Sequence, residues 1–224
     1  MSRDTIRLPH DAYWLLQTLR AAGHSAYVVG GCVRDSLLGR LPGDWDICTS
    51  ARPDEMRALF HDQRMILTGE KHGTVAVILH GKPYEMTTYR LDGSYRDHRH
   101  PDNVQFVDDL AADLARRDFT INAMAYHPVR GLVDPYEGQA DLHHRIIRCV
   151  GNPTQRFQED ALRILRALRF ASQLSFSLAI DTENALFEQA ASLSYVAGER
   201  LSVELEGMLC AQSVRAVLLN YAEV

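Results

Sequence analysis

Residues 27–50 read "YVVGGCVRDSLLGRLPGDWDICTS", and this stretch decides how the rest of the chain is interpreted. Its pattern predicts a strand over 26–29, a turn at Gly30 and Gly31, a helix over 32–38 and a second strand that carries Asp44 and Asp46. Unpaired N–H groups at a helix N-terminus favour anions, and glycine lets a phosphate approach the backbone closely. The turn is therefore a candidate phosphate-binding site, to which Arg34 adds a forked cationic donor.

The two aspartates point to metal-assisted chemistry at the same place. Side chains two residues apart on a strand share a face, so Asp44 and Asp46 present two carboxylates together. Hard oxygen ligands of this kind favour Mg²⁺ over zinc. A glycine pair alone is more often only a turn, and an Asp-x-Asp alone only a solvated loop. Because the two patterns are consecutive, we interpret them as a phosphoryl-transfer site.

Length and composition are those of an ordinary globular protein. The 224 residues fit one large or two small domains, with 46% hydrophobic and 24% charged residues. No apolar run approaches the ~20 residues of a membrane span, and the first residues lack the layout of a secretory signal, so we expect no membrane partner and a cytoplasmic location. We expect reduced, buried thiols at Cys32, Cys48, Cys149 and Cys210.

The charge is uneven along the chain. A net charge of −5 counts mildly against RNA binding by the whole surface. A local basic surface within residues 145–170 nevertheless remains an alternative, because this segment contains Arg145, Arg148, Arg156, Arg163, Arg166 and Arg169.

Periodicity separates a sheet region from a helical region. Helices are predicted over 10–22 and 53–60, and strands over 64–69, 73–79 and 83–90. Residues 91–103 have the composition of a loop, and the apolar spacing of 108–126 and 159–174 predicts helices. A mixed sheet with helices against it should give way to a helical domain near residues 130–150.

Several motifs together carry a specific family resemblance. The chain resembles the class II tRNA nucleotidyltransferase and bacterial poly(A) polymerase family in Gly30-Gly31, Arg34-Asp35 and Asp44-Trp45-Asp46. The resemblance implies an α+β fold, with a DNA polymerase β-like nucleotidyltransferase head over 1–145 and an all-α neck over 146–224. The family's body and tail domains are expected to be absent from this chain. It also implies that the glycine segment holds a triphosphate and that Asp44 and Asp46 hold the catalytic metals.

A third carboxylate and a second motif extend the site. If the strand with Glu85 neighbours the one with the aspartates, three carboxylates converge on Mg²⁺; otherwise Glu85 is a surface side chain. In "RRDFTINAMAY", residues 116–126, Asp118 can cap a helix that begins at 119. The resemblance implies that Asp118 contacts the ribose hydroxyls, and that Arg117 and Asn122 contact the sugar or phosphates.

Asp160 and Arg163, in "RFQEDALRILRALRF", could recognise a base. On one helix they lie ~60° apart, with Arg166 nearby, and the simple alternative is an i, i+3 salt bridge. Cytosine and adenine both present an amino donor beside a ring-nitrogen acceptor. A carboxylate beside a guanidinium matches these two bases and leaves unpaired groups against uracil and guanine. In the family this segment serves as a protein template that selects C and A.

Weaker matches complete the resemblance. Residues 134–142 resemble the family's interdomain segment, and 198–209, with Glu199 and Arg200, a helix that supports the base-reading helix. The loop with Asp97 and Arg99 resembles a flexible element used in adding the terminal A. We expect solvated side chains at His98, His100, His143 and His144.

The resemblance implies an enzyme that adds C, C and A to the tRNA 3′ end from CTP and ATP, with release of pyrophosphate. A-adding, CC-adding or poly(A)-polymerase activity remains an alternative, as does a non-catalytic nucleotide- or RNA-binding module.

Overall fold

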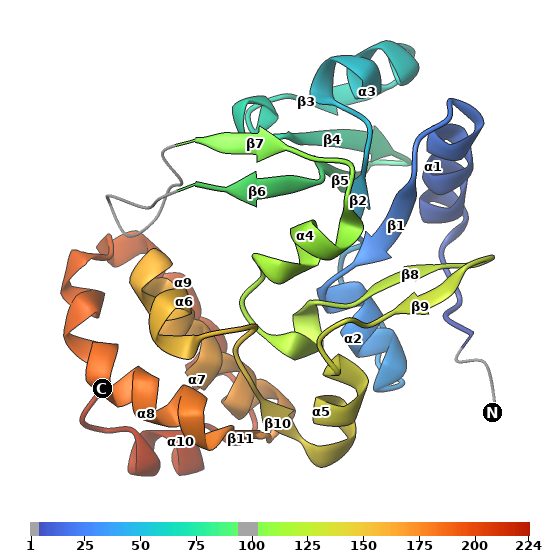
Figure 1. The fold of residues 1–224 in the computed structure, drawn as a ribbon. Coiled ribbons are helices and arrows are strands. Elements are labelled where there is room, and N and C mark those ends of the chain that lie inside the picture. The colour runs from blue at the N-terminus through green and yellow to red at the C-terminus, as the bar shows by residue number, and fades with distance from the viewer. Residues whose placement is uncertain (1–4, 94–102) are drawn as a thin grey trace. The chain divides into compact units, whose positions relative to one another are not determined.

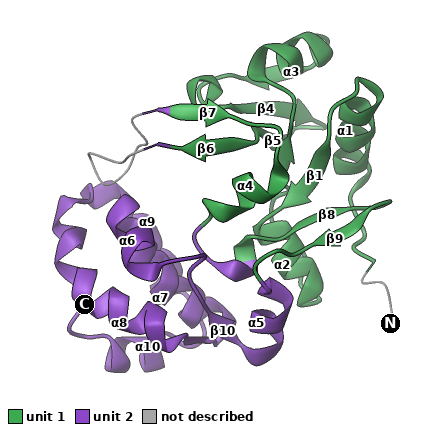
Figure 2. Cartoon of the chain, viewed as in Figure 1, with its two compact units in different colours: residues 1–92, 104–117, 122–136 green, residues 93–103, 118–121, 137–224 purple. Residues whose placement is uncertain are grey.

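A computed structural model of the chain describes residues 5–93 and 103–224, arranged in two compact units (Figure 2). Unit 1 comprises residues 1–92, 104–117 and 122–136, and unit 2 comprises 93–103, 118–121 and 137–224. The predicted head–neck division at residue 145 stays a prediction, and the last crossing between the compact units falls after Tyr136. The proposed flexible element with Asp97 and Arg99 lies outside the described residues, as do His98 and His100.

Unit 1 is built on a seven-stranded mixed sheet (Figure 1). Its strands are β1 (Ala26–Val29), β2 (Ile47–Thr49), β3 (Arg64–Ile66), β4 (Thr74–Leu79), β5 (Lys82–Thr88), β8 (Ala125–His127) and β9 (Gly131–Val133). The order is β3-β4-β5-β2-β1-β8-β9, with β2 and β5 parallel and the other neighbours antiparallel. A separate hairpin pairs β6 (Arg90–Asp92) with β7 (Val104–Phe106), so residues 91 and 92 are strand where we predicted loop.

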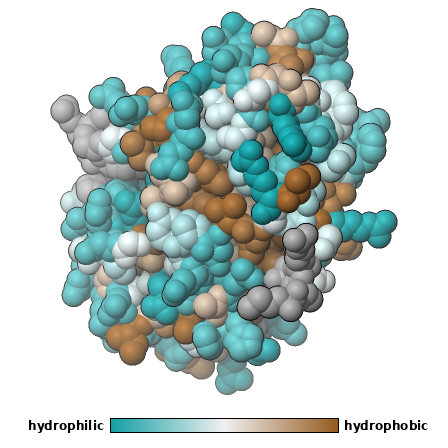
Figure 3. Space-filling model, turned by 45° about the vertical axis from the view of Figure 1, so that its right-hand side comes forward, coloured by the Kyte–Doolittle hydropathy of each residue, from teal (hydrophilic) through white to brown (hydrophobic). Residues whose placement is uncertain are grey.

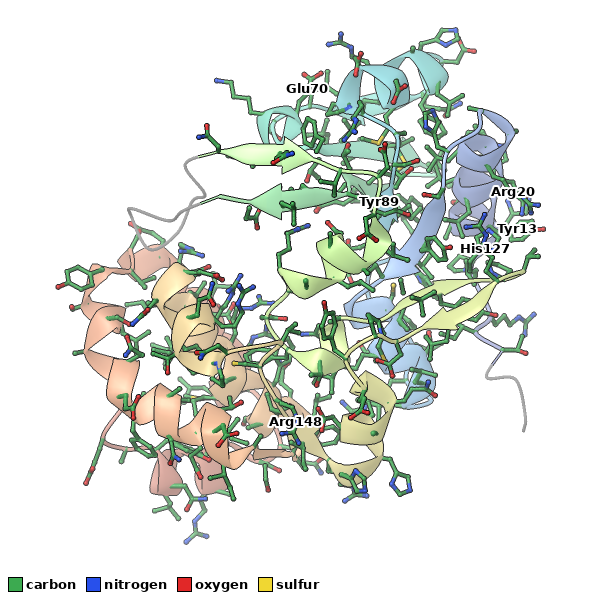
Figure 4. The ribbon with its side chains drawn as sticks, in the orientation of Figure 1. Tyr13, Arg20, Glu70, Tyr89, His127 and Arg148 are labelled. Atoms are coloured by element: carbon green, nitrogen blue, oxygen red, sulfur yellow. The ribbon has the colours of Figure 1, made fainter. Side chains whose placement is uncertain are left out.

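Helices cover this sheet because their apolar residues recur at helical spacing. The helices are α1 (His10–Ala21), α2 (Gly31–Leu37), α3 (Pro53–Leu59), α4 (Leu110–Ala115) and the 3₁₀ turn η1 (Glu70–His72). A further 3₁₀ turn, η2 (Thr120–Asn122), begins in unit 2 and ends in unit 1. α1 buries Leu15, Leu16 and Leu19 and contacts β1, β2 and α3. The sheet-side core includes Tyr89, labelled in Figure 4, whose hydroxyl accepts a hydrogen bond from Ser25 Oγ at 3.2 Å.

Unit 2 is mainly helical. It contains α5 (Gly138–His144), α6 (Pro153–Glu159), α7 (Leu162–Leu174), α8 (Ile180–Gln189), the 3₁₀ helix η3 (Ala190–Tyr195), α9 (Gly198–Leu209), α10 (Val214–Asn220) and a parallel pair of short strands, β10 (Ile146–Ile147) and β11 (Ser177–Leu178). α7 contacts α9 and α10. A Cβ at Gly207 would lie 2.7 Å from Arg169 Cδ, so a larger residue there would force the Arg169 side chain or the contact between α9 and α7 to shift.

The long helix predicted over 108–126 is wrong. α4 ends at Ala115, and the chain then passes through η2 into β8. Long-range backbone pairing explains the difference: the Thr120 N–H donates to Arg148 O at 2.9 Å, and Tyr126 pairs with Val28 of β1. Sheet pairing outweighs the weak local helix preference of this segment.

Hydrophilic side chains, drawn in teal, cover most of the face shown in Figure 3, with apolar patches between them. Within residues 5–93 and 103–224, no helix is long and apolar enough to cross a membrane. All four cysteines are free, but the expectation that all are buried fails for Cys210, which is exposed. His143 and His144 are exposed as expected.

Candidate active site

The Gly30-Gly31 turn joins β1 to α2 and requires glycine at its first position. Gly30 has φ 81° and ψ −130°, a backbone conformation that L side chains rarely adopt. A Cβ there would lie 3.2 Å from Arg117 Nη1 and 3.8 Å from the Asn122 carbonyl oxygen, whereas one at Gly31 would lie 3.7 Å from Arg34 Nη2. The structure therefore places two predicted phosphate-binding guanidinium groups against the predicted turn.

Arg34 is buried and links two parts of the motif. Its Nε and Nη2 donate to the carboxylate of Asp35 at 2.8 and 3.0 Å, and its Nη1 donates to Asn122 Oδ1 at 2.8 Å. Asn122, predicted as a nucleotide contact, is therefore fixed by another predicted residue. Asp35 was missing from the predicted site, although its position directly after Arg34 is the signal that could have identified it.

The two aspartates lie before the strand in which they were predicted. Asp44 and Asp46 precede β2 instead of lying within it. The Asp46 carbonyl nevertheless accepts from the Val29 N–H at 3.0 Å and so extends the pairing with β1. β2 runs parallel to β5 with Ile47 opposite Met86, which brings Glu85 beside Asp46. The neighbouring strands that we required for a third carboxylate are confirmed. The Glu85 side chain is nevertheless exposed, as the alternative of a surface side chain expected, so the convergence of three carboxylates on a metal stays a prediction.

Electrostatics agrees with this proximity. Burial, followed by the negative charges of Asp44 and Glu85, raises the pKa of Asp46 to about 6, and Arg117 opposes the rise. Such mutual repulsion between hard oxygen donors is what a divalent cation relieves. In the part of the chain that the structure describes, no three His, Cys, Asp or Glu side chains are gathered closely enough to form a ready-made metal site. The three carboxylates thus fit a cation by chemistry and neighbourhood, without forming a closed cage.

Asp118, which is buried, forms an ion pair with the half-buried Arg166 within unit 2. Nε and Nη2 of Arg166 both donate to Asp118 Oδ2, at 2.9 and 2.7 Å, and the Phe119 N–H donates to Oδ1 at 2.8 Å. Burial by itself raises the pKa of Asp118, but the charge and hydrogen bonds of Arg166 outweigh it and lower the pKa to about 2. Asp118 does not begin an α-helix as predicted, because Phe119 forms a bridge to Cys149 and a 3₁₀ turn follows.

The predicted helix through Asp160 is interrupted at that residue. Asp160 has extended backbone, φ −143° and ψ 103°, and separates α6 from α7. Its carboxylate accepts from the Leu162 N–H at 3.1 Å and pairs with Arg200 at 2.9 Å, while Arg163 pairs with Glu159 at 2.7 Å. The ~60° separation on one helix is therefore wrong. The charges of the expected Asp160–Arg163 salt bridge each pair with another residue, Asp160 with Arg200 and Arg163 with Glu159.

The predicted basic surface over 145–170 is largely neutralised. Five of its arginines are paired with carboxylates, namely Arg148 with Asp141, Arg156 and Arg163 with Glu159, Arg166 with Asp118, and Arg169 with Glu204. The arginine content of this segment allowed a local basic surface, but these ion pairs do not support one.

Each unit therefore gathers its own part of the predicted set. Unit 1 holds the glycine turn, the carboxylates and three polar neighbours, namely Gly30, Gly31, Arg34, Asp44, Asp46, Glu85, Arg117 and Asn122. Unit 2 holds Asp118, Asp160, Arg163 and Arg166.

Comparison with known proteins agrees with the geometry. The fold of unit 1, with carboxylates beside a glycine turn, is that of a nucleotidyltransferase head. The sequence profile of the family described as "Poly A polymerase head domain" matches residues 26–148, more than half of the chain. The chain belongs to this family.

Similar proteins are CCA-adding enzymes. That of Geobacillus thermodenitrificans is 49% identical over 213 residues, which are 95% of this chain and 52% of the relative. The crystal structure of the Bacillus stearothermophilus CCA-adding enzyme in complex with CTP matches with a TM-score of 0.85 and 44% identity, covering 92% of this chain and 50% of that one. A tRNA nucleotidyltransferase complexed with a primer tRNA and an incoming ATP analogue matches at 0.73 and 32%, covering 92% and 59%. The chain thus spans about half the length of the curated relatives it matches.

Proposed function

We propose that this chain carries the nucleotide-binding and catalytic part of a template-independent RNA nucleotidyltransferase. In this proposal the tRNA 3′-hydroxyl attacks the α-phosphate of CTP or ATP, pyrophosphate leaves, and C, C and A are added in turn. The observation that carries the proposal is the β2–β5 register, which sets Glu85 beside Asp46, with the guanidinium of Arg117 close enough to lower the pKa of Asp46. Similarity to CCA-adding enzymes over nearly the whole chain supports it.

The carboxylates would hold the divalent cation, Mg²⁺ in this proposal. Asp44, Asp46 and Glu85 supply its oxygen ligands, and the cation would lower the pKa of the attacking hydroxyl and neutralise charge on the phosphate. Arg117 and Arg34, at the glycine turn, supply fixed cationic donors for the remaining phosphate oxygens.

Base choice is assigned to unit 2. Asp160 can accept from an exocyclic amino group, and Arg163 can donate to the neighbouring ring nitrogen of cytosine or adenine. Both side chains already hold partners, Arg200 and Glu159. Arg200 and Glu159 therefore hold the two side chains in place, and each side chain must keep or exchange this partner when it contacts a base. In this proposal Asp118 holds Arg166 in place and also makes the ribose contact that the family resemblance implies.

The assay starts from tRNA that lacks its 3′ end, with Mg²⁺ and one nucleotide at a time. Addition of C and then A supports the proposal. A poly(A) polymerase, favoured by the description of the matching family, would add A-tails to any RNA. CC-only or A-only addition would identify the narrower enzymes, and nucleotide binding without pyrophosphate release would identify a non-catalytic module.

The metal assignment has its own test. Asp46→Ala should abolish turnover and keep most of the affinity for CTP, because the cation is lost while the guanidinium groups remain. Asp62→Ala, with a side chain that is 81% exposed, is the matched control and should leave turnover unchanged. Full turnover in the Asp46 variant would refute the assignment.

We also propose that this activity belongs to the cytoplasm. The tRNA substrate and the buried free thiols Cys32, Cys48 and Cys149 support a reducing compartment. Fractionation of cells that produce the protein tests this.

A further inference from the structure

Arg117 links the two halves of the candidate site in unit 1. Its Nη1 lies 3.2 Å from the position that a Cβ at Gly30 would take, and its charge opposes the rise in the pKa of Asp46. A flexible arginine does not by itself hold such a position, because it loses side-chain entropy when it is fixed. The orientation of this side chain therefore needs a cause elsewhere in the structure.

Asp113 of α4 provides that cause. Its side chain is completely buried. Its Oδ1 accepts from Nε and Nη2 of Arg116 at 3.0 and 2.8 Å and from the Arg90 N–H at 3.3 Å. Its Oδ2 accepts from Arg117 Nη2 at 3.3 Å. Burial by itself raises the pKa of Asp113, but the two guanidinium groups outweigh it, so the pKa lies below its ordinary value and the carboxylate stays charged.

Each carboxylate oxygen of Asp113 binds a different arginine. Arg116 and Arg117 follow Asp113 by three and four residues, the spacings at which side chains meet along a helix turn. Arg116 also contacts Asp92 at 3.6 Å, which anchors one side of the carboxylate. The other oxygen holds Nη2 of Arg117, while Nη1 of the same planar guanidinium faces Gly30.

We propose that Asp113 is a positioning residue, which aims Arg117 at the phosphates of a nucleotide seated on the Gly30-Gly31 turn. This inference rests on the proposed function, since it assumes a nucleoside triphosphate at that turn. Asp113 touches no substrate and acts through Arg117.

The test compares ligands with and without phosphates. Asp113→Asn should raise the Kd for CTP about tenfold, measured by calorimetry, and leave that for cytidine, measured by NMR titration, within twofold. Asp109→Asn makes the same chemical change at the N-cap of the same helix, where asparagine caps equally well, and should match the wild type. In an Arg117→Met background, Asp113→Asn should have no further effect on CTP binding.

Three results would overturn the inference in a folded protein. They are an unchanged Kd for CTP, an equal loss for CTP and cytidine, and a further loss in the Arg117→Met background. If circular dichroism shows that Asp113→Asn is unfolded, Asp113→Glu replaces it. The longer carboxylate keeps its charge but displaces Arg117, so CTP binding should weaken about threefold, and unchanged binding again refutes the role. A wild-type protein that binds no CTP would instead refute the proposed function itself.

Discussion

Replacing Gly30 by alanine should damage both stability and nucleotide binding. At φ 81° and ψ −130° an alanine backbone is strained by about 1–3 kcal/mol. For a chain of this size that corresponds to a fall in Tm of roughly 2–12 °C. The new methyl group would also meet Arg117 Nη1 at 3.2 Å, so the guanidinium has to move. Losing one charged hydrogen bond to phosphate costs about 1.5–3 kcal/mol, so the Kd for CTP should rise tenfold or more.

Gly39 offers a control that separates the two effects. It has φ +70° and nothing within 4 Å of an added Cβ, so Gly39→Ala carries the backbone strain without the collision. We expect a lower Tm in both variants and weaker CTP binding only in Gly30→Ala. Calorimetric titration of CTP together with thermal unfolding measures both quantities. A folded Gly30→Ala protein that binds CTP within twofold of the wild type would refute the reasoning about Arg117.

Three other substitutions, one of them with a matched control, test separate parts of the structure. Arg163→Ala should bring the kcat/KM values for UTP and GTP closer to those for CTP and ATP, and preserved selectivity would count against base reading. Asp118→Asn should lower stability by about 2 kcal/mol at neutral pH by removing the ion pair with Arg166. Because the pKa of Asp118 is lowered to about 2, that loss should be constant above about pH 4 and shrink as the pH falls further; a loss in Tm independent of pH would contradict it. Gly207→Ala, which overpacks the contact between α7 and α9, should cost about 1–3 kcal/mol, whereas Gly198→Ala, with open space around it, should not lower Tm.

Much of unit 1 could be predicted because its signals are local. The β-branched run of β4, the glycine turn and the apolar stripe of α1 all specify structure through nearest neighbours. No local pattern says which strands become neighbours, so the sequence alone leaves the pairing of β2 with β5 undetermined. In the structure the two strands do pair.

The helix through Asp160 could not be predicted correctly from spacing. Its apolar neighbours fit a continuous helix, and the break depends on a side-chain bond to the Leu162 N–H and on Arg200, forty residues away. The sequence does not reveal the role that we propose for Asp113, for a different reason. Its i+3 and i+4 arginines were visible in the sequence, but on an exposed helix the same spacing gives only a surface ion pair. Asp113 is buried in the structure, which the apolar spacing of this segment did not predict, and burial makes its ion pairs more than surface contacts.

The route of the chain also limits how this protein can be divided. Residues 118–121 belong to unit 2, although unit 1 precedes and follows them in the sequence. Phe119 is completely buried and its ring meets that of Phe170 at 5.9 Å, edge to face. Cleavage after Tyr136 would therefore leave an aromatic side chain on the first fragment without the partner ring that packs against it. A fusion protein that joins another chain after Tyr136 would lack the same contact.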